Sequence, residues 1–156
     1  MGNHVLYEKK GYKAYIILNK PEKLNALEGE MYRDVLTYLT DAENDNNIRV
    51  VILKGAGRCF SAGYDITAEM NTVVTPIEER AGFQSHANAA RWKMWGMNKP
   101  VISQIHGYAL GGACELMMPA DYVIASEDCQ IGEPQIQFGA ASVFLMVPWL
   151  TGIRKG

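Results

Sequence analysis

A nearly continuous apolar segment followed by a glycine-bearing loop most constrains the fold of this chain. Residues 48–55, IRVVILKG, are rich in β-branched side chains and are typical of a strand covered on both faces. A loop follows at 55–65, and PVISQIHG at 100–107 repeats the order of strand and glycine loop. Since helical patterns alternate with these strands, the chain is predicted to be an α/β protein.

The other predicted elements fit the same architecture. Apolar residues recur at helical spacing from Glu28 to about Asn44, and a second long helical pattern covers 77–97. The remaining predictions are a hairpin over 5–19 with Gly11 at its turn, two short strands within 120–134, and a helix over 142–152 despite Pro148.

Right-handed crossovers place the loops that follow parallel strands on one side of the sheet. The glycine-bearing loops 55–65 and 107–112 are therefore expected to meet there. The 156 residues are predicted to form one domain, because 48% of them are hydrophobic and no linker or repeat divides the chain.

Charge and apolar segments exclude several classes of partner. The formal net charge is only −2, and the charges are spread along the chain, so no nucleic-acid or anionic-membrane surface is predicted. The longest apolar run, 143–150, is far below the roughly 20 residues that span a membrane. Cys59, Cys114 and Cys129 are interpreted as buried thiols in a reducing compartment. No targeting segment is recognised, and the chain is predicted to be cytoplasmic.

The segment HGYALGGACELMMPAD at 106–121 places two glycines before a short apolar helix that carries one carboxylate. Gly111 and Gly112 either expose backbone N–H groups to a ligand oxygen or only allow the helix to pack closely. Glu115 either caps the helix or is a buried functional carboxylate. Gly63, taken alone, is a turn glycine.

Three segments together resemble the enoyl-CoA hydratase/isomerase family, also called the crotonase family. They are NKPEKLNALEGEM near the start, CFSAGYDI at 59–66, and LGGACELMMPADYVIASEDCQIGEP at 110–134. The resemblance runs through essentially the whole chain in the right order. It implies a spiral of ββα units, assembled as a homotrimer or a hexamer, that binds acyl-CoA thioesters in fatty acid metabolism.

The resemblance also implies residue roles. The backbone N–H groups of Tyr64 and Gly112 match the pair that polarises the thioester carbonyl in the family's oxyanion hole. Neither a metal nor a cofactor is implied, since coenzyme A is part of the substrate. Candidate contacts to the acyl-CoA are Lys23, Leu24, Ala62, Asp65, Ile66 and Gly111. For Lys23 the alternative is an ordinary solvated lysine, and for Asp65 it is a helix cap.

Hydratases of the family use two glutamates on one water molecule. Glu115 matches the first of them, and Gln135 stands at the position of the second. An amide can orient water or substrate, but it cannot exchange a proton near neutral pH. Glu133 could substitute if the loop were shifted, and in an extended segment it should share the side of Gln135.

Two classes of function follow from these residues. The leading hypothesis is a hydratase/isomerase-like enzyme, a lyase or an isomerase, with Glu115 as its acid/base. The alternatives are an acyl-CoA hydrolase and a CoA-thioester-binding or assembly protein without turnover. PWLTGIRKG at 148–156 resembles the start of further helical structure, so the domain over 1–156 is expected to lack the family's C-terminal helical region.

Overall fold

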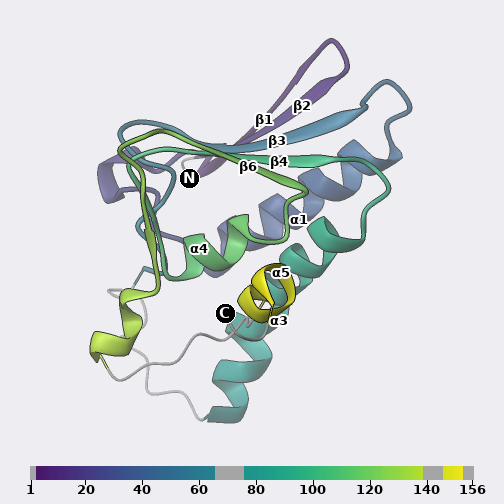
Figure 1. Cartoon of the computed structure of the whole chain (residues 1–156). Coiled ribbons are helices and arrows are strands. Elements are labelled where there is room, and N and C mark those ends of the chain that lie inside the picture. Colours follow the sequence, from purple (N-terminus) through teal and green to yellow (C-terminus); the bar gives the residue numbers. More distant parts are fainter. Residues whose placement is uncertain (1–2, 66–75, 139–145, 153–156) are drawn as a thin grey trace.

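A five-stranded sheet is the centre of the computed structural model, which describes residues 3–65, 76–138 and 146–152 (Figure 1). Its strands lie in the order β1-β2-β3-β4-β6, with β1 and β2 antiparallel and every other neighbouring pair parallel. The strands are β1 (Val5–Lys10), β2 (Lys13–Leu18), β3 (Val50–Gly55), β4 (Val101–Ile105) and β6 (Tyr122–Ala125). The α/β prediction is therefore confirmed.

Helices lie on one side of this sheet, as Figure 1 shows. They are α1 (Gly29–Asn44), α3 (Pro76–Gly96), α4 (Gly112–Met117) and, toward the end of the chain, α5 (Val147–Thr151). Two short 3-10 helices are η1 (Pro21–Lys23) and η2 (Pro134–Phe138). The two long helices agree with the sequence patterns, and α5 agrees with the described part of the third. No helix in the described ranges is long and apolar enough to cross a membrane.

The hydrophobic core fills the space between the sheet and α1. The apolar positions of α1 that recur at helical spacing are buried against the strands, while its polar positions remain toward solvent. The buried residues of this helix are Met31, Tyr32, Val35, Leu39 and Ala42. Cys59 and Cys114 are also buried, as expected, whereas Cys129 is only half-buried.

The prediction that the strand at 48–55 is covered on both faces is wrong for the described residues. Along β3, the fully buried Val51 and Leu53 alternate with the half-buried Val50 and Ile52. The helices cover only one face of the sheet, so every second side chain of β3 points to the uncovered face.

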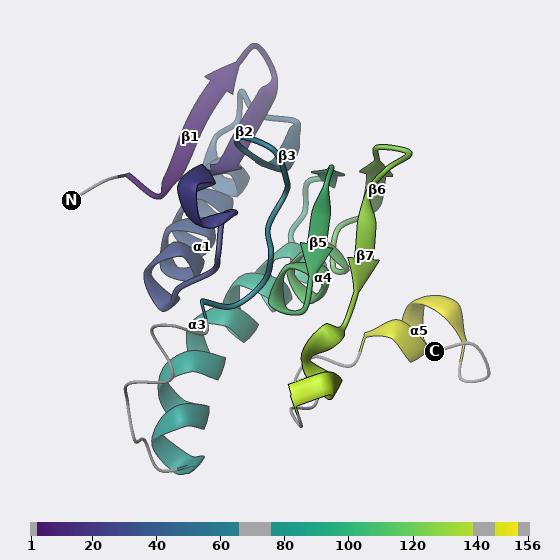
Figure 2. The ribbon, with the colours of Figure 1, turned by 90° about the vertical axis from the view of Figure 1, so that its left-hand side faces the viewer.

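The two glycine-bearing loops meet beyond the ends of β3 and β4, as expected. The Phe60 N–H donates to the His106 carbonyl at 2.8 Å, and the Ser61 N–H donates to the Tyr108 carbonyl at 2.9 Å. The second loop contains β5 (Tyr108–Leu110), a strand that the sequence patterns missed. It pairs in parallel with β7 (Gln130–Gly132), and Figure 2 shows the two side by side near α4.

Candidate active site

The two turns that carry the expected oxyanion residues lie against each other. Gly63 has a φ of +97°, and a Cβ atom there would lie 2.5 Å from the Leu110 carbonyl oxygen. The same Cβ would lie 3.5 Å from the Gly112 nitrogen. Both the backbone angle and the close approach therefore require glycine at position 63, and Tyr64 follows directly.

The backbone N–H of Tyr64 has a defined direction. The Leu27 N–H donates to the Gly63 carbonyl at 2.7 Å, and the Asp65 N–H donates to the Leu27 carbonyl at 3.0 Å. The Gly63 carbonyl and the Tyr64 N–H belong to one trans peptide, so they point in opposite directions. The Tyr64 N–H thus faces away from Leu27.

Gly111 and Gly112 are glycines for different reasons. Gly111 has a φ of +50° and a ψ of −121°, a conformation that favours glycine. Gly112 begins α4, so its N–H lies outside the intrahelical hydrogen bonds. A Cβ on Gly112 would lie 2.5 Å from the Tyr64 ring. The second glycine therefore makes room for a tyrosine ring, which neither sequence alternative foresaw.

The carboxylate of Glu115 is completely buried and bound by two side chains. The Tyr64 hydroxyl donates to Glu115 Oε2 at 2.6 Å, and Arg91 Nη2 lies 2.7 Å from the same oxygen. Both partners of the ion pair have 0% exposed side chains. The interpretation of Glu115 as a buried carboxylate is confirmed, and its partners come from other segments of the chain.

Sequence reasoning missed Arg91, although a signal was present. Arg91 lies on α3 between the buried Ala90 and Met94, so it places a charge on the apolar face of that helix. A charged residue on a buried helix face needs a partner of opposite charge. Glu115, the other buried charge in an apolar segment, is that partner.

Two tyrosines complete the cluster. Arg91 Nη2 also donates to the Tyr64 hydroxyl at 2.6 Å and to the Tyr32 hydroxyl at 3.3 Å. Burial raises the pKa of both hydroxyls, so both remain neutral hydrogen-bonding groups at neutral pH. Although burial opposes the charge of Arg91, its interactions with Tyr32, Tyr64 and Glu115 raise its pKa.

Glu133 and Gln135 lie side by side at the start of η2. Gln135 Nε2 donates to the Glu133 carboxylate, and the Cys114 thiol lies against the same carboxylate. Burial, and then the charge of Glu115, raises the pKa of Glu133 above its usual value of 4.5. The two side chains share one side, as expected, but the chain turns into a 3-10 helix there and is not extended.

Glu133 and Gln135 each have one buried oxygen to which no described residue donates a hydrogen bond. Glu133 Oε1 and Gln135 Oε1 are buried, and neither has a hydrogen-bond partner within the ranges that the structure describes. Gln135 Oε1 lies 3.3 Å from the position that a Cβ of Gly111 would occupy. The structure therefore brings Gly111, Gly112, Glu115 and Gln135 together, with Glu133 added.

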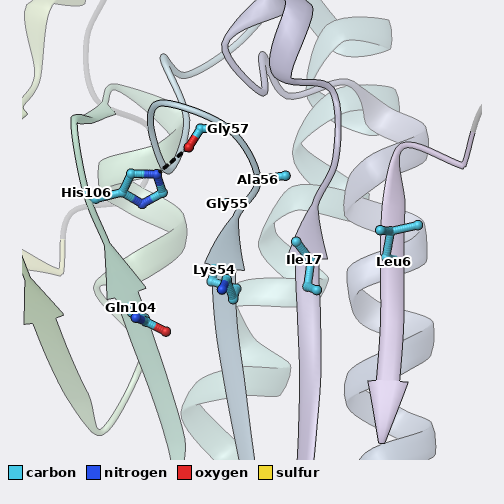
Figure 3. A pocket seen from close by; sticks show the side chains of 8 residues that line it. All are labelled: Leu6, Ile17, Lys54, Gly55, Ala56, Gly57, Gln104 and His106. Atoms are coloured by element: carbon cyan, nitrogen blue, oxygen red, sulfur yellow. Dashed lines mark hydrogen bonds between the residues drawn. The ribbon is translucent and has the colours of Figure 1, made fainter.

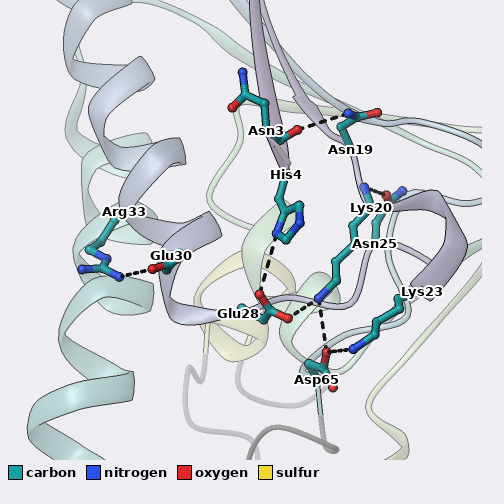
Figure 4. A network of polar contacts seen from close by, with 10 residues as sticks. All are labelled: Asn3, His4, Asn19, Lys20, Lys23, Asn25, Glu28, Glu30, Arg33 and Asp65. Atoms are coloured by element: carbon teal, nitrogen blue, oxygen red, sulfur yellow. Dashed lines mark hydrogen bonds and ion pairs between the residues drawn. The ribbon is translucent and has the colours of Figure 1, made fainter. Parts of the chain in front are cut away.

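Lys23 and Asp65, two of the expected coenzyme A residues, lie in a network of polar contacts shown in Figure 4. Lys23 Nζ lies 3.3 Å from Asp65 Oδ2, and the buried Lys20 lies 3.4 Å from the same oxygen and pairs with Glu28. Asp65 is thus held by two lysines, an ion pairing that neither alternative for it included. The alternative of Lys23 as an ordinary solvated lysine is only partly right, because Lys23 is half-exposed but paired.

Leu24 and Ala62 are joined directly, because the Ala62 N–H donates to the Leu24 carbonyl at 2.9 Å. The buried Asn25 fixes the same loop by donating to the carbonyl oxygens of Cys59 and Phe60 at 2.9 and 3.0 Å. Ile66 lies outside the described residues, as does the helix that Asp65 was suggested to cap.

A groove of about 460 Å³ lies on the uncovered face of the sheet (Figure 3). His106 faces it, and its Nε2 lies 2.9 Å from the Gly57 carbonyl oxygen. The groove is lined by Leu6, Ile17, Lys54, Gly55, Ala56, Gly57, Gln104 and His106. None of the expected site residues that the structure describes lines it, so the groove is separate from the cluster around Glu115.

Comparisons with known proteins agree with this fold. A family model described as enoyl-CoA hydratase/isomerase matches residues 8–153. A solved enoyl-CoA hydratase/isomerase from Xanthobacter autotrophicus Py2 superposes with a TM-score of 0.92 at 36% identity, over 97% of this chain and 56% of that one. An enoyl-CoA hydratase from Thermoplasma volcanium gives 0.88 at 33% identity, over 97% and 60%. The fold is that of the crotonase family.

The chain belongs to the enoyl-CoA hydratase/isomerase family. Among curated relatives, a short-chain-enoyl-CoA hydratase of Clostridium acetobutylicum is 37% identical over 145 residues, which are 91% of this chain and 54% of the relative. A probable enoyl-CoA hydratase of Rhizobium meliloti is 34% identical over 97% of this chain and 54% of its own length. The chain thus spans about half the length of the curated relatives it matches.

Substitution of Gly112 tests the packing of the Tyr64 ring. In Gly112→Ala the new methyl group would overlap that ring, so we expect the free energy of unfolding to fall by about 1–3 kcal/mol. Gly96→Ala is the matched control, because no atom lies within 4 Å of its added Cβ and alanine favours the helix by up to about 1 kcal/mol. Urea unfolding measures both, and equal stability of the two variants would contradict the packing.

Substitution of Glu133 tests its buried environment. Folding raises the pKa of Glu133 above 4.5. Below pH 4.5 the carboxyl is protonated in both the folded and the unfolded protein, so it costs no stability. As the pH rises through the folded pKa, the buried carboxyl lowers the free energy of unfolding. We therefore expect Glu133→Gln to raise the melting temperature at pH 7 but not at pH 4. The exposed Glu127→Gln is the control. An equal effect of Glu133→Gln at both pH values would refute the assignment.

Proposed function

We propose that the whole protein hydrates an enoyl-CoA thioester, with the thioester carbonyl bound by the backbone N–H groups of Tyr64 and Gly112. The observation that carries this proposal is the contact between the turns at Gly63 and Gly112, with the Glu115 carboxylate one turn into the same short helix. The family supports it, since the relative from Clostridium acetobutylicum is named a short-chain-enoyl-CoA hydratase and the solved protein from Thermoplasma volcanium an enoyl-CoA hydratase.

The two backbone donors supply electrostatic stabilisation in this proposal. Positioned N–H groups are each worth roughly 3 kcal/mol toward the negative charge that develops on a thioester oxygen. Both donors lie at positions of defined backbone geometry, after Gly63 and at the first residue of α4. The site is therefore organised before the substrate binds.

Hydration then needs two proton transfers. The oxygen of a water molecule bonds to the β carbon while Glu115 takes one of its protons. The electron pair of the carbon–carbon double bond moves toward the thioester oxygen, and the resulting enolate receives a proton at the α carbon. General acid and base groups of this kind contribute about 10²–10⁴-fold each.

We assign the second proton transfer to Glu133. Gln135 cannot donate a proton near neutral pH, but its amide nitrogen binds the Glu133 carboxylate and orients it. The raised pKa of Glu133 favours the protonated form that a donor needs, while Arg91 faces the carboxylate of Glu115. Two neighbouring carboxyls in different environments suit a base and an acid.

Isomerisation of a double bond is the second candidate. The glutamine at position 135 favours it, because one base that moves a proton between two carbons needs only Glu115. The same N–H groups would hold the enolate. The two candidates differ in whether water is added to the substrate.

Coenzyme A recognition is assigned to the segment around Lys23. Lys23, Leu24, Ala62 and Asp65 lie in two hydrogen-bonded loops, and Lys23 is the half-exposed cation among them. Contacts from Ile66 and Gly111, assembly as a trimer or hexamer, and a cytoplasmic location remain predictions.

A panel of enoyl-CoA, dienoyl-CoA and cyclic acyl-CoA thioesters tests the proposal. Hydration, isomerisation and release of CoA are followed separately with the whole protein. We expect hydration, and we expect Glu115→Gln to lower kcat by about 100-fold or more, because the amide keeps the shape of the carboxylate but not its basicity. The exposed Glu30→Gln serves as control.

Each other outcome has a distinct meaning. Release of CoA alone would replace hydration by hydrolysis, and isomerisation without hydration would select the second candidate. Tight binding of acyl-CoA without turnover would indicate a binding protein. Full activity of Glu115→Gln on every substrate that reacts would remove Glu115 from the reaction.

A further inference from the structure

Arg91 is the largest fully buried side chain in the described part of the chain. A guanidinium group is costly to bury, and an apolar residue at the same place on α3 would pack between Ala87 and Met94 at lower cost. The proposed reaction as described so far uses Arg91 only as the counter-ion of Glu115. Its other contacts point to a wider role.

The side chain of Arg91 contacts Glu115 and Tyr64 directly, and it contacts Gly112 through Tyr32. Nη2 lies 2.7 Å from Glu115 Oε2 and donates to the Tyr64 hydroxyl at 2.6 Å. Tyr64 carries one of the two backbone donors. Nη2 also donates to the Tyr32 hydroxyl at 3.3 Å, which in turn donates to the Gly112 carbonyl at 3.3 Å. Gly112 carries the other donor.

We propose that Arg91 is a positioning residue that holds Glu115, Tyr64 and Gly112 in one arrangement through a single guanidinium group. This inference rests on the proposed function. It deepens that function, because it makes the geometry of both backbone donors and of the carboxylate depend on one residue of α3. A displacement of about 1 Å in such a site can lower the rate about 100-fold.

Lysine cannot replace Arg91 in this role. The guanidinium is planar and rigid: Nη1 donates to Asn88 Oδ1 at 2.9 Å while Nη2 serves the other partners. Lysine carries one ammonium on a flexible chain and keeps the charge without the planar fork. A residue that only balances the charge of Glu115 would tolerate this exchange, whereas a positioning residue would not.

The first test compares Arg91→Lys with Lys93→Met. Lys93 lies on the same helix and pairs with Glu43 outside the site, so its substitution removes a cation of α3 without touching the cluster. We expect Arg91→Lys to lower kcat for enoyl-CoA hydration by about 10–100-fold while KM changes by less than about 3-fold. Lys93→Met should keep the wild-type kcat.

The pH profile gives a readout that folding alone would not move. Arg91→Met removes the ion pair between Arg91 and the buried carboxylate of Glu115. We expect the acid limb of the kcat profile to move to higher pH in Arg91→Met, and to move less in Arg91→Lys. Lys93→Met should keep the wild-type profile.

Two hydroxyl deletions keep the test decisive if Arg91 variants do not fold. Tyr64→Phe keeps the backbone N–H and the ring but removes the hydrogen bonds that join the Tyr64 hydroxyl to Arg91 and to Glu115. Tyr32→Phe removes the hydroxyl that joins Arg91 to the Gly112 carbonyl. We expect each to lower kcat by about 10-fold with little change in KM. Tyr38→Phe, on the same helix as Tyr32, is the matched control because its ring stacks on Tyr7 away from the site.

The outcomes separate this inference from the proposed function. If the wild-type protein turns over no acyl-CoA, the proposed function fails and this inference fails with it. If the wild type is active while Arg91→Lys, Tyr64→Phe and Tyr32→Phe keep its kcat and pH profile, only the role of Arg91 is refuted. Selective loss of kcat in the cluster variants, with unchanged controls, supports it.

Discussion

Two backbone segments that are far apart in the sequence lie in contact beyond the ends of β3 and β4, and the candidate site depends on this contact. It is made by main-chain hydrogen bonds from Phe60 to His106 and from Ser61 to Tyr108. The close approach is possible because Gly107 has no side chain, and a Cβ there would lie 2.4 Å from the Arg58 carbonyl oxygen. Main-chain hydrogen bonds of this kind pair the backbone groups of the two segments and hold the segments together.

Burial of charge is the second constraint on the site. Arg91 and Glu115 are both removed from water, and each would be strongly destabilising alone. Together with the hydroxyls of Tyr32 and Tyr64 they form a hydrogen-bonded cluster that joins α1, α3, α4 and the turn after Gly63. Glu133, whose pKa is raised, lies near Glu115. The carboxylate of Glu115, in contrast, faces the cation of Arg91.

Much of the fold could be predicted from the sequence because it depends on local patterns. The β-branched run at 48–55 and the helical spacing of 28–44 require only neighbouring residues, and the meeting of two loops follows from the topology of parallel strands. The strand β5 was missed because three residues are too few to show a period. The prediction that both faces of β3 are covered was wrong, because coverage depends on which other elements pack against the sheet.

Only the part of the site that lies within the sequence motifs could be predicted. The positions of Gly63, Gly112 and Glu115 follow from motif and fold, but the partner of Glu115 lies on another helix, and no sequence spacing identifies it. The pairing of Asp65 with Lys20 was missed for the same reason. Contacts between distant segments need the three-dimensional structure.

Exchange of the α hydrogen tests whether the site stabilises a thioester enolate, as we propose, without choosing between hydration and isomerisation. The whole protein is incubated in D₂O with a short saturated acyl-CoA, and deuterium at the α carbon is followed by mass spectrometry. We expect exchange well above the rate without protein. Binding of the thioester with no exchange above that rate would contradict it.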